Sequence, residues 1–220
     1  GDLGDVGYLH DDELLKRSLQ NARAALLQGV TTLCDCGGRS GPSLACRKAS
    51  RSESSRLPRI LVSLSPLTRR EGHCSEFGYE AEDAGAMREA VKRHVAAGAD
   101  VIKIMASGGS GRNERFPPWQ AQYDVGALEG AVDEARRVGR CVIAHARGVE
   151  AIRNCIAASV DVISHCTWET PEGHRYDAEL TEEIAARGIA VDPTVVAGFN
   201  AARSPAIPAA RRRRLQDVLP

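Results

Sequence analysis

The sequence predicts an α/β fold of the (β/α)8 TIM-type barrel class, and three observations lead to that prediction. Short apolar segments alternate along the chain with amphipathic helical segments, a pattern typical of buried parallel strands joined by crossover helices. The first expected strand is not followed by the G-x-G-x-x-G spacing of a dinucleotide-binding open sheet. Polar side chains also stand at the carboxyl ends of several expected strands, where barrel enzymes carry their active sites. These residues are Asp35, Lys103, His145 and His165.

The first unit of the pattern is a helix followed by a strand. Residues 13–28 place their apolar side chains at helical spacing on one stripe, with Asp11 or Asp12 available as the N-cap. Gly29 is expected to end this helix. The β-branched apolar run 30–36 then predicts a strand, and the sequence GGRSGP after it predicts a turn.

The same order of helix, glycine and strand recurs along the rest of the chain, with one strand standing between the first two units. The expected strands number six in all, and their alternation with helices supports a parallel sheet. The later helices are expected at 81–98, 125–139, 149–156 and 178–188, and the later strands at 59–67, 99–109, 140–148, 160–166 and 189–196.

Composition places the chain among ordinary globular domains. Its 220 residues are 43% hydrophobic and 26% charged, so residues 1–220 are expected to form one domain. Lys plus Arg and Asp plus Glu both number 29, which leaves no net charge to attract nucleic acid or an anionic membrane. A small-molecule partner is therefore expected. A homo-oligomer is compatible with the sequence, which carries no feature that decides the oligomeric state.

The cysteines and the apolar runs bear on the cellular compartment. The 7 cysteines form an odd, scattered set without a secretory signal, a pattern that favours a reducing compartment over a disulfide framework. We therefore expect a cytoplasmic protein. No apolar run approaches the ~20 residues that a membrane helix requires.

Two histidines and one lysine lie in segments that are otherwise apolar. A lone histidine is more often a core or loop residue, but His145 and His165 each close an expected strand, so neighbouring strands could present both imidazoles to one metal. Lys103 lies inside the run VIKIM, where a buried ammonium group needs a partner. A salt bridge, a Schiff base with a carbonyl substrate, and a carbamate formed with carbon dioxide all remain open.

Four segments together resemble a known family. They are GVTTLCDCGG, ADVIKIMASGG, VIAHARGVEAI and VDVISHCTWET, in this order. They resemble the metal-dependent amidohydrolase superfamily, in its imidazolonepropionase-like and Xaa-Pro dipeptidase branch. The resemblance runs from about residue 13 to residue 197. Each motif is weak alone, and the set is specific.

The resemblance implies a catalytic metal centre. Lys103 would be a lysine carboxylated by carbon dioxide that bridges two divalent metals, usually zinc, and His145 and His165 would be metal ligands. These three residues would also be the catalytic ones. A hydroxide shared by the metals would attack the carbonyl carbon of an amide-type bond while a metal polarises the carbonyl oxygen. The substrate would be a dipeptide or an N-acyl amino acid.

The resemblance also suggests residues that bind the substrate. Tyr123 resembles a contact to a substrate carboxylate, with a packing role as the alternative. Arg147 stands where relatives often carry a histidine, so it could hold an anionic group, or lie on a solvated loop. His73 would line the pocket, and Asp35 would support it through hydrogen bonds.

The departures from the family concern both ends of the barrel. None of the 6 histidines is followed two positions later by another, so the His-x-His of the first strand is missing. No aspartate aligns with that of the eighth strand, because Asp192 belongs to the seventh. We therefore expect an incomplete barrel with strands 2 to 7 present. The first and eighth strands and the flanking β-sandwich would be missing, leaving a single catalytic-barrel domain truncated at both ends.

Two rival functions remain open at this stage. A Schiff-base lyase or aldolase would also use a strand lysine such as Lys103, although the paired histidines would then be unexplained. A catalytically incomplete barrel fragment without activity would explain the missing strands.

Overall fold

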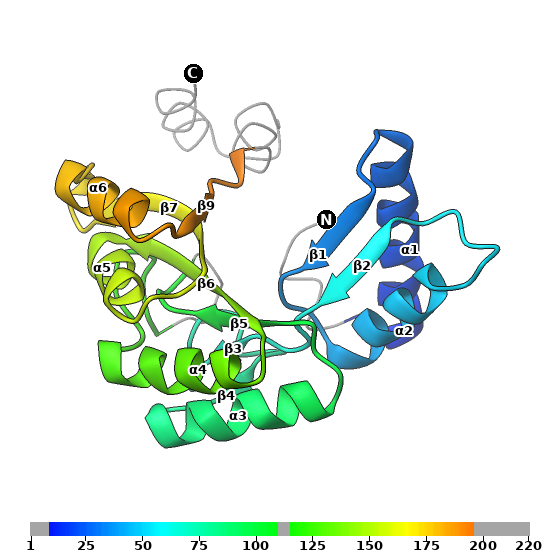
Figure 1. The fold of residues 1–220 in the computed structure, drawn as a ribbon, viewed down its shortest axis with the longest axis horizontal. Coiled ribbons are helices and arrows are strands. Elements are labelled where there is room, and N and C mark those ends of the chain that lie inside the picture. The colour runs from blue at the N-terminus through cyan, green and yellow to red at the C-terminus, as the bar shows by residue number, and fades with distance from the viewer. Residues whose placement is uncertain (1–8, 110–114, 196–220) are drawn as a thin grey trace.

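The computed structural model describes residues 9–109 and 115–195 and has an α/β architecture (Figure 1). Its helices are α1 (Asp11–Leu27), α2 (Ser40–Ser50), α3 (Ala84–Ala96), α4 (Val125–Arg137), α5 (Val149–Ala157) and α6 (Ala178–Ala186). Its strands are β1 (Thr32–Asp35), β2 (Arg59–Val62), β3 (Leu67–Thr68), β4 (Tyr79–Glu80), β5 (Val101–Met105), β6 (Cys141–Gly148), β7 (Val162–Thr170), β8 (Gly173–His174) and β9 (Ala190–Asp192).

The main strands are parallel and follow one another in chain order. β1 pairs with β2 in one sheet, and in the other β5 pairs with β6, β6 with β7, and β7 with β9, all in parallel. The two sheets meet where the Asp100 amide donates to the Val62 carbonyl oxygen at 2.8 Å and the Val62 amide donates to the Asp100 carboxylate at 3.0 Å. Within the described ranges β1 and β9 do not pair with each other, so these strands form no closed barrel.

The hydrophobic core lies between the sheet and the helices on its outer face. Ile102 and Ile104 of β5 and Val142 and Ala144 of β6 are fully buried and belong to the same cluster as the apolar faces of α3, α4 and α5. Successive side chains of a strand point to opposite faces, so the residues between them face away from these helices. Lys103 is one of these residues, which explains why a lysine can occupy the centre of an apolar strand.

The predicted strand over 59–67 is interrupted. β2 ends at Val62, and β3 resumes at Leu67 and pairs with β5 instead of β1. Leu64 between them has φ of 64°, a left-handed conformation that cannot continue a strand. The prediction of one continuous strand was therefore wrong.

Two further predictions near the N-terminal end of the described chain were wrong. The helix α2 begins at Ser40 within the stretch predicted as a turn, because Pro42 falls in its first turn, where a missing N–H is tolerated. The N-cap of α1 is His10, while Asp11 and Asp12 lie in the first helical turn and interact favourably with the helix dipole. Gly29 follows α1 with φ of 89°, and its role as the end of that helix is confirmed.

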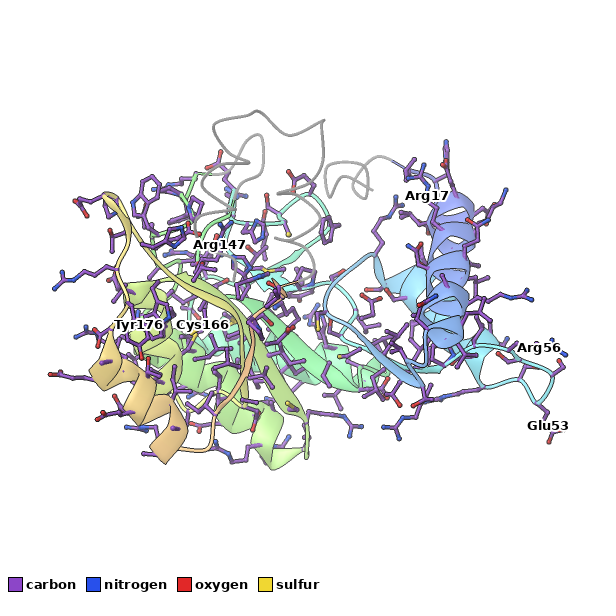
Figure 2. The ribbon with its side chains drawn as sticks, turned by 90° about the horizontal axis from the view of Figure 1, so that it is seen from above. Arg17, Glu53, Arg56, Arg147, Cys166 and Tyr176 are labelled. Carbon is purple, nitrogen blue, oxygen red and sulfur yellow. The ribbon has the colours of Figure 1, made fainter. Side chains whose placement is uncertain are left out.

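The described chain has two parts, one around the β1–β2 sheet and one around the larger sheet. Figure 2 shows Arg17 on the outer helix α1 and Glu53 and Arg56 at the tip of the connection between α2 and β2. Arg147 and Cys166 lie in the other part, which is built from the later strands.

Over the described ranges, no helix combines the length and apolar composition needed to cross a lipid bilayer.

Gly148, at the junction of β6 and α5, allows a close backbone approach. A Cβ atom there would lie 2.0 Å from the Trp119 carbonyl oxygen, so Gly148→Ala is expected to lower the free energy of unfolding by about 1–3 kcal/mol. Urea unfolding followed by circular dichroism measures the change. The matched control is Gly126→Ala in α4, where the nearest atom to an added Cβ is 3.8 Å away and stability should hold or rise. Equal midpoints for the two variants would contradict the expected steric effect.

Candidate functional site

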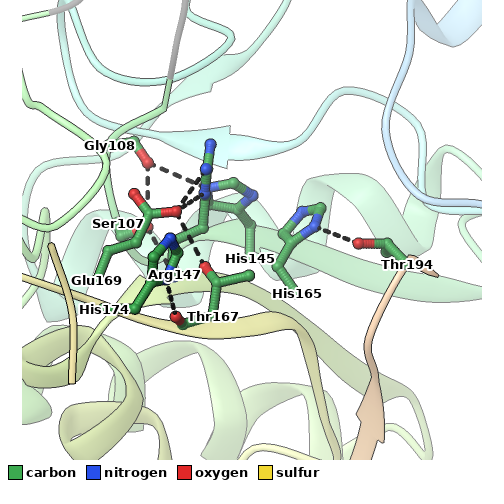
Figure 3. A network of polar contacts seen from close by, with 9 residues as sticks. All are labelled: Ser107, Gly108, His145, Arg147, His165, Thr167, Glu169, His174 and Thr194. Carbon is green, nitrogen blue, oxygen red and sulfur yellow. Dashed lines mark hydrogen bonds and ion pairs between the residues drawn. The ribbon is translucent and has the colours of Figure 1, made fainter. Parts of the chain in front are cut away.

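Three of the predicted site residues lie on neighbouring parallel strands. Lys103 is on β5, His145 on β6 and His165 on β7, and the register aligns Met105 with His145 and Ala146 with His165. Figure 3 shows the two histidine rings side by side, with ring centroids 4.5 Å apart and an interplanar angle of 71°. The strand register thus brings the two imidazoles together, while their role as ligands stays a prediction.

Lys103 is a buried amine with little compensation for its charge. Its side chain is 4% exposed, and its Nζ donates to Ser164 Oγ at 3.4 Å. In the part of the chain that the structure describes, no carboxylate lies within ion-pair distance of it. Burial lowers the pKa of Lys103, which favours the neutral amine. The neutral amine is the form that reacts with carbon dioxide or with a carbonyl group.

The two histidines are held as neutral rings. His145 Nε2 lies 3.0 Å from the Gly108 carbonyl oxygen, which can only accept, so Nε2 carries the proton and Nδ1 keeps its lone pair. Burial, with the neighbouring His73 and His165, sets the pKa of His145 well below its usual value. Burial, followed by the charge of Lys103, lowers the pKa of His165 to about 4. A neutral imidazole is the form that binds metals.

The backbone at His165 is in an uncommon conformation. His165 has φ of 72° and Cys166 has φ of 52°, both in the left-handed region that costs energy for residues other than glycine. His165 Nδ1 lies 2.8 Å from Thr194 Oγ1, a contact that fixes the ring (Figure 3). Strained backbone of this kind clusters at functional sites.

His73 extends the cluster to three imidazoles. Its ring centroid lies 4.4 Å from that of His145, and the side chain is buried. Gly109 makes room for it, because a Cβ there would lie 2.1 Å from the His73 ring. This contact places His73 beside His145, while its expected place in the lining of a substrate pocket stays a prediction.

Gln122 is a site residue that the sequence did not reveal. It is 2% exposed, its amide nitrogen donates to the Met105 carbonyl oxygen, and its Oε1 accepts from the His73 amide at 2.8 Å. Gln122 therefore ties the end of β5 to the loop that carries His73. The available signal was its place directly before Tyr123 in the chain.

Tyr123 lies in the hydrophobic core. It is 3% exposed, and its hydroxyl donates to the Ala81 carbonyl oxygen at 2.8 Å. Burial raises the pKa of this phenol, so it stays protonated. These contacts correspond to the packing role that was the alternative to a substrate contact.

Arg147 is paired with an acidic side chain. Its Nε donates to Glu169 Oε1 at 2.9 Å, and its backbone amide donates to Ser107 Oγ at 3.1 Å. Thr167 Oγ1 donates to the same carboxylate at 3.2 Å (Figure 3). An anionic substrate group at Arg147 would have to compete with Glu169.

Two aspartates stand at the ends of other parallel strands. Asp35, at the end of β1, accepts from Ser43 Oγ at 2.5 Å and so ties α2 to the strand. This contact matches the supporting role predicted for it. Asp192 in β9 aligns with Ser164, and its negative charge offsets part of the lowering of the pKa that burial imposes on Lys103 and His165. Asp192 is therefore a carboxylate close enough to influence the cluster.

Comparison with known sequences decides the family. Residues 10–215 match the profile of the Amidohydrolase family, which covers most of the chain. The chain belongs to the amidohydrolase family. The resemblance found in the sequence is thereby confirmed.

The chain is similar in sequence to an ochratoxinase and in fold to a solved prolidase. Ochratoxinase of Aspergillus niger is 34% identical over 103 residues, which are 47% of this chain and 20% of that protein. The crystal structure of A. niger ochratoxinase has a TM-score of 0.78 at 25% identity, covering 99% of this chain and 54% of that one. A prolidase complexed with N-methylphosphonate-L-proline has a TM-score of 0.82 at 24% identity and covers 99% of this chain and 56% of that one. The chain thus spans about half the length of these solved structures.

The described chain also has a pocket next to the Arg147–Glu169 pair. Its volume is about 560 Å³, within the range of small-molecule sites, and it shares Glu169 with the polar network of Figure 3. Lys103, His145 and His165 do not line it. Its lining consists of Trp119, Gln120, Val149, Glu150, Arg153, Glu169, Thr170, Pro171, Glu172, Arg175 and Asp177.

The donors for a metal are only partly assembled. In residues 9–109 and 115–195, no three or more histidine, cysteine, aspartate or glutamate side chains come together in a metal-binding group. Besides His73, the cluster offers the neutral imidazoles of His145 and His165 and the amine of Lys103, and a carbamate on Lys103 would add two oxygen donors. These groups suit a divalent ion such as zinc.

Proposed function

We propose that the protein hydrolyses a C–N bond of the amide or peptide type, in a dipeptide or an N-acyl amino acid. The observation that carries the proposal is the buried Lys103 amine, without a carboxylate partner in the described chain, beside the neutral His145 and His165. Membership of the amidohydrolase family supports it, as do relatives named as a prolidase and an ochratoxinase. We also propose that the parallel strands correspond to the second to seventh of a (β/α)8 barrel.

Lys103, His145 and His165 would hold the metal ions in this proposal. The neutral Lys103 amine would add to carbon dioxide and lose a proton, giving a carbamate with two oxygens for two divalent ions. We propose zinc, because it accepts both imidazole nitrogen and carboxylate-type oxygen. Metal ions bound there would activate a water molecule and polarise the substrate carbonyl.

The chain's own residues hold this centre in place. The hydrogen bond to the Gly108 carbonyl oxygen fixes the tautomer and orientation of His145, and the contact with Thr194 Oγ1 fixes the orientation of the His165 ring. Ser164 Oγ keeps Lys103 Nζ on the inner side of β5. The low exposure of Lys103 and His145 keeps bulk water away from both groups.

A Schiff-base lyase or aldolase is the second candidate. The lowered pKa of Lys103 favours it as well, because a neutral amine attacks a carbonyl carbon and releases water to form an imine. This mechanism gives no role to the His145 and His165 rings beside Lys103. Trapping of an imine on Lys103 by borohydride would distinguish it from hydrolysis.

Hydrolysis is expected to be visible in the products. Zinc-loaded protein is incubated with Xaa-Pro dipeptides and N-acyl amino acids in ¹⁸O-labelled water, and released amino acids are measured by mass spectrometry. We expect one class to be cleaved, with ¹⁸O in the newly formed carboxylate. Tyr123→Phe is the control, because the core position of this residue predicts near-normal activity. Absence of cleavage together with borohydride labelling of Lys103 would overturn the proposal.

A further inference from the structure

Two cysteines at the end of β1 lie in contact. Cys34 and Cys36 are two positions apart in an extended segment, so their side chains point to the same face, and their sulfur atoms are 3.8 Å apart. Cys34 is exposed and Cys36 is partly exposed, and both are free thiols. Asp35 between them is anchored by Ser43 on the opposite face. The spacing of the two sulfurs is therefore set by a fixed backbone.

The sulfur separation fits a bridging atom better than a direct bond. A disulfide requires about 2.05 Å between the sulfurs, so the pair would have to close by nearly half of its separation. Two sulfurs bound to one atom at about 2.3 Å stand roughly 3.2 Å apart at a pyramidal angle of about 90° and roughly 3.8 Å apart at the tetrahedral angle. The 3.8 Å between Cys34 and Cys36 lies at the upper end of this range, so the pair needs only a small closure to hold one bridging atom.

The protonation of the Cys34 and Cys36 thiols also favours reaction with a thiophilic acceptor. Contact with Cys34 lowers the pKa of Cys36 to about 7. The pKa of Cys34 is raised by the same contact. The lowered pKa favours the thiolate of Cys36, which is the form that attacks a thiophilic acceptor.

The number of metal-binding side chains around Cys34 and Cys36 limits the kinds of ligand that the pair could hold. In the described part of the chain, Cys34 and Cys36 are not joined by a third metal-binding side chain. An ion that requires four protein donors is therefore disfavoured. A monosubstituted trivalent arsenical needs only two thiolates, because its third position is already filled by carbon.

We propose that Cys34 and Cys36 form a two-thiolate site for thiophilic acceptors of the trivalent arsenical class. With phenylarsine oxide, two arsenic–sulfur bonds form, the arsenic–oxygen bond breaks, and the oxygen leaves as water with the two thiol protons. Arsenic remains trivalent throughout, so no oxidant is required. This site does not depend on the proposed hydrolysis.

The test uses phenylarsine oxide and intact-protein mass spectrometry, with a phosphine as the reductant. We expect one adduct per chain, with the mass of the reagent less one water. Cys34→Ser and Cys36→Ser should each weaken binding by about 100-fold or more, because the second bond is then no longer intramolecular. Circular dichroism checks the folding of each variant.

The controls address the other partly exposed thiols. Cys141→Ser and Cys166→Ser should retain the adduct, and peptide mapping should place arsenic on the segment that contains both Cys34 and Cys36. Equal binding by folded Cys34→Ser, or arsenic found only on Cys141 or Cys166, would overturn the proposal.

Discussion

Replacing Lys103 with methionine is expected to remove bound divalent metal and to reduce hydrolysis by at least about 100-fold, since even indirect support of a metal ligand contributes 10- to 100-fold. Lys103 is 4% exposed, and its amine is the group that would carry the carbamate. Methionine keeps a similar volume but cannot react with carbon dioxide. Elemental analysis of the purified protein measures the metal, and release of the amino acid measures the activity.

The control for this variant separates loss of the metal from loss of the fold. Lys103 has its one hydrogen bond within residues 9–109 and 115–195 to Ser164, so removing its buried amine should leave the urea midpoint of the metal-free protein unchanged or higher. With ¹³C-bicarbonate, the wild type should show a carbamate carbon signal in the NMR spectrum that Lys103→Met lacks. Equal metal content in the folded variant would show that Lys103 is not part of the centre.

Acidification is expected to destabilise the metal-free protein between pH 6.5 and pH 4. An unfolded histidine has a pKa near 6.5, whereas burial lowers that of folded His165 to about 4. In this window the unfolded chain binds a proton that the folded chain does not, so stability rises with pH. His165 alone contributes a loss of at most about 3 kcal/mol as the pH falls to 4. His145 acts in the same direction.

Urea unfolding at a series of pH values, with a chelator present, measures this loss. His165→Gln is the matched variant, because glutamine keeps a polar side chain near Thr194 but does not titrate. Its stability should fall less steeply between pH 6.5 and pH 4. Parallel curves for the wild type and His165→Gln would show that the folded histidine is protonated as readily as the unfolded one.

The sequence predicted the elements whose local pattern agrees with their packing. The apolar faces of α3, α4 and α5 cover β5 and β6, so periodicity and burial give the same answer there. The placement of Lys103 and His145 on neighbouring strands follows from the same parallel register. For these elements, local and tertiary preferences coincide.

The features that the sequence did not predict depend on contacts between distant residues. The break at Leu64 follows from the exchange of strand partners between β1 and β5, which no local pattern records. The contact between His73 and His145 requires Gly109 and Gln122 to shape a loop. The hydroxyl of Tyr123 reaches the Ala81 carbonyl oxygen across 42 positions of the chain.

The left-handed backbone of β7 has a consequence for protein engineering. His165 and Cys166 each hold a conformation that costs roughly 1–3 kcal/mol for a residue other than glycine. Designs selected only for a higher melting temperature will favour glycine or asparagine at these positions. Such substitutions would relax β7 and delete the imidazole that stands beside His145. Stabilising substitutions in this protein should therefore leave His165 and Cys166 unchanged and be placed on the outer helices instead.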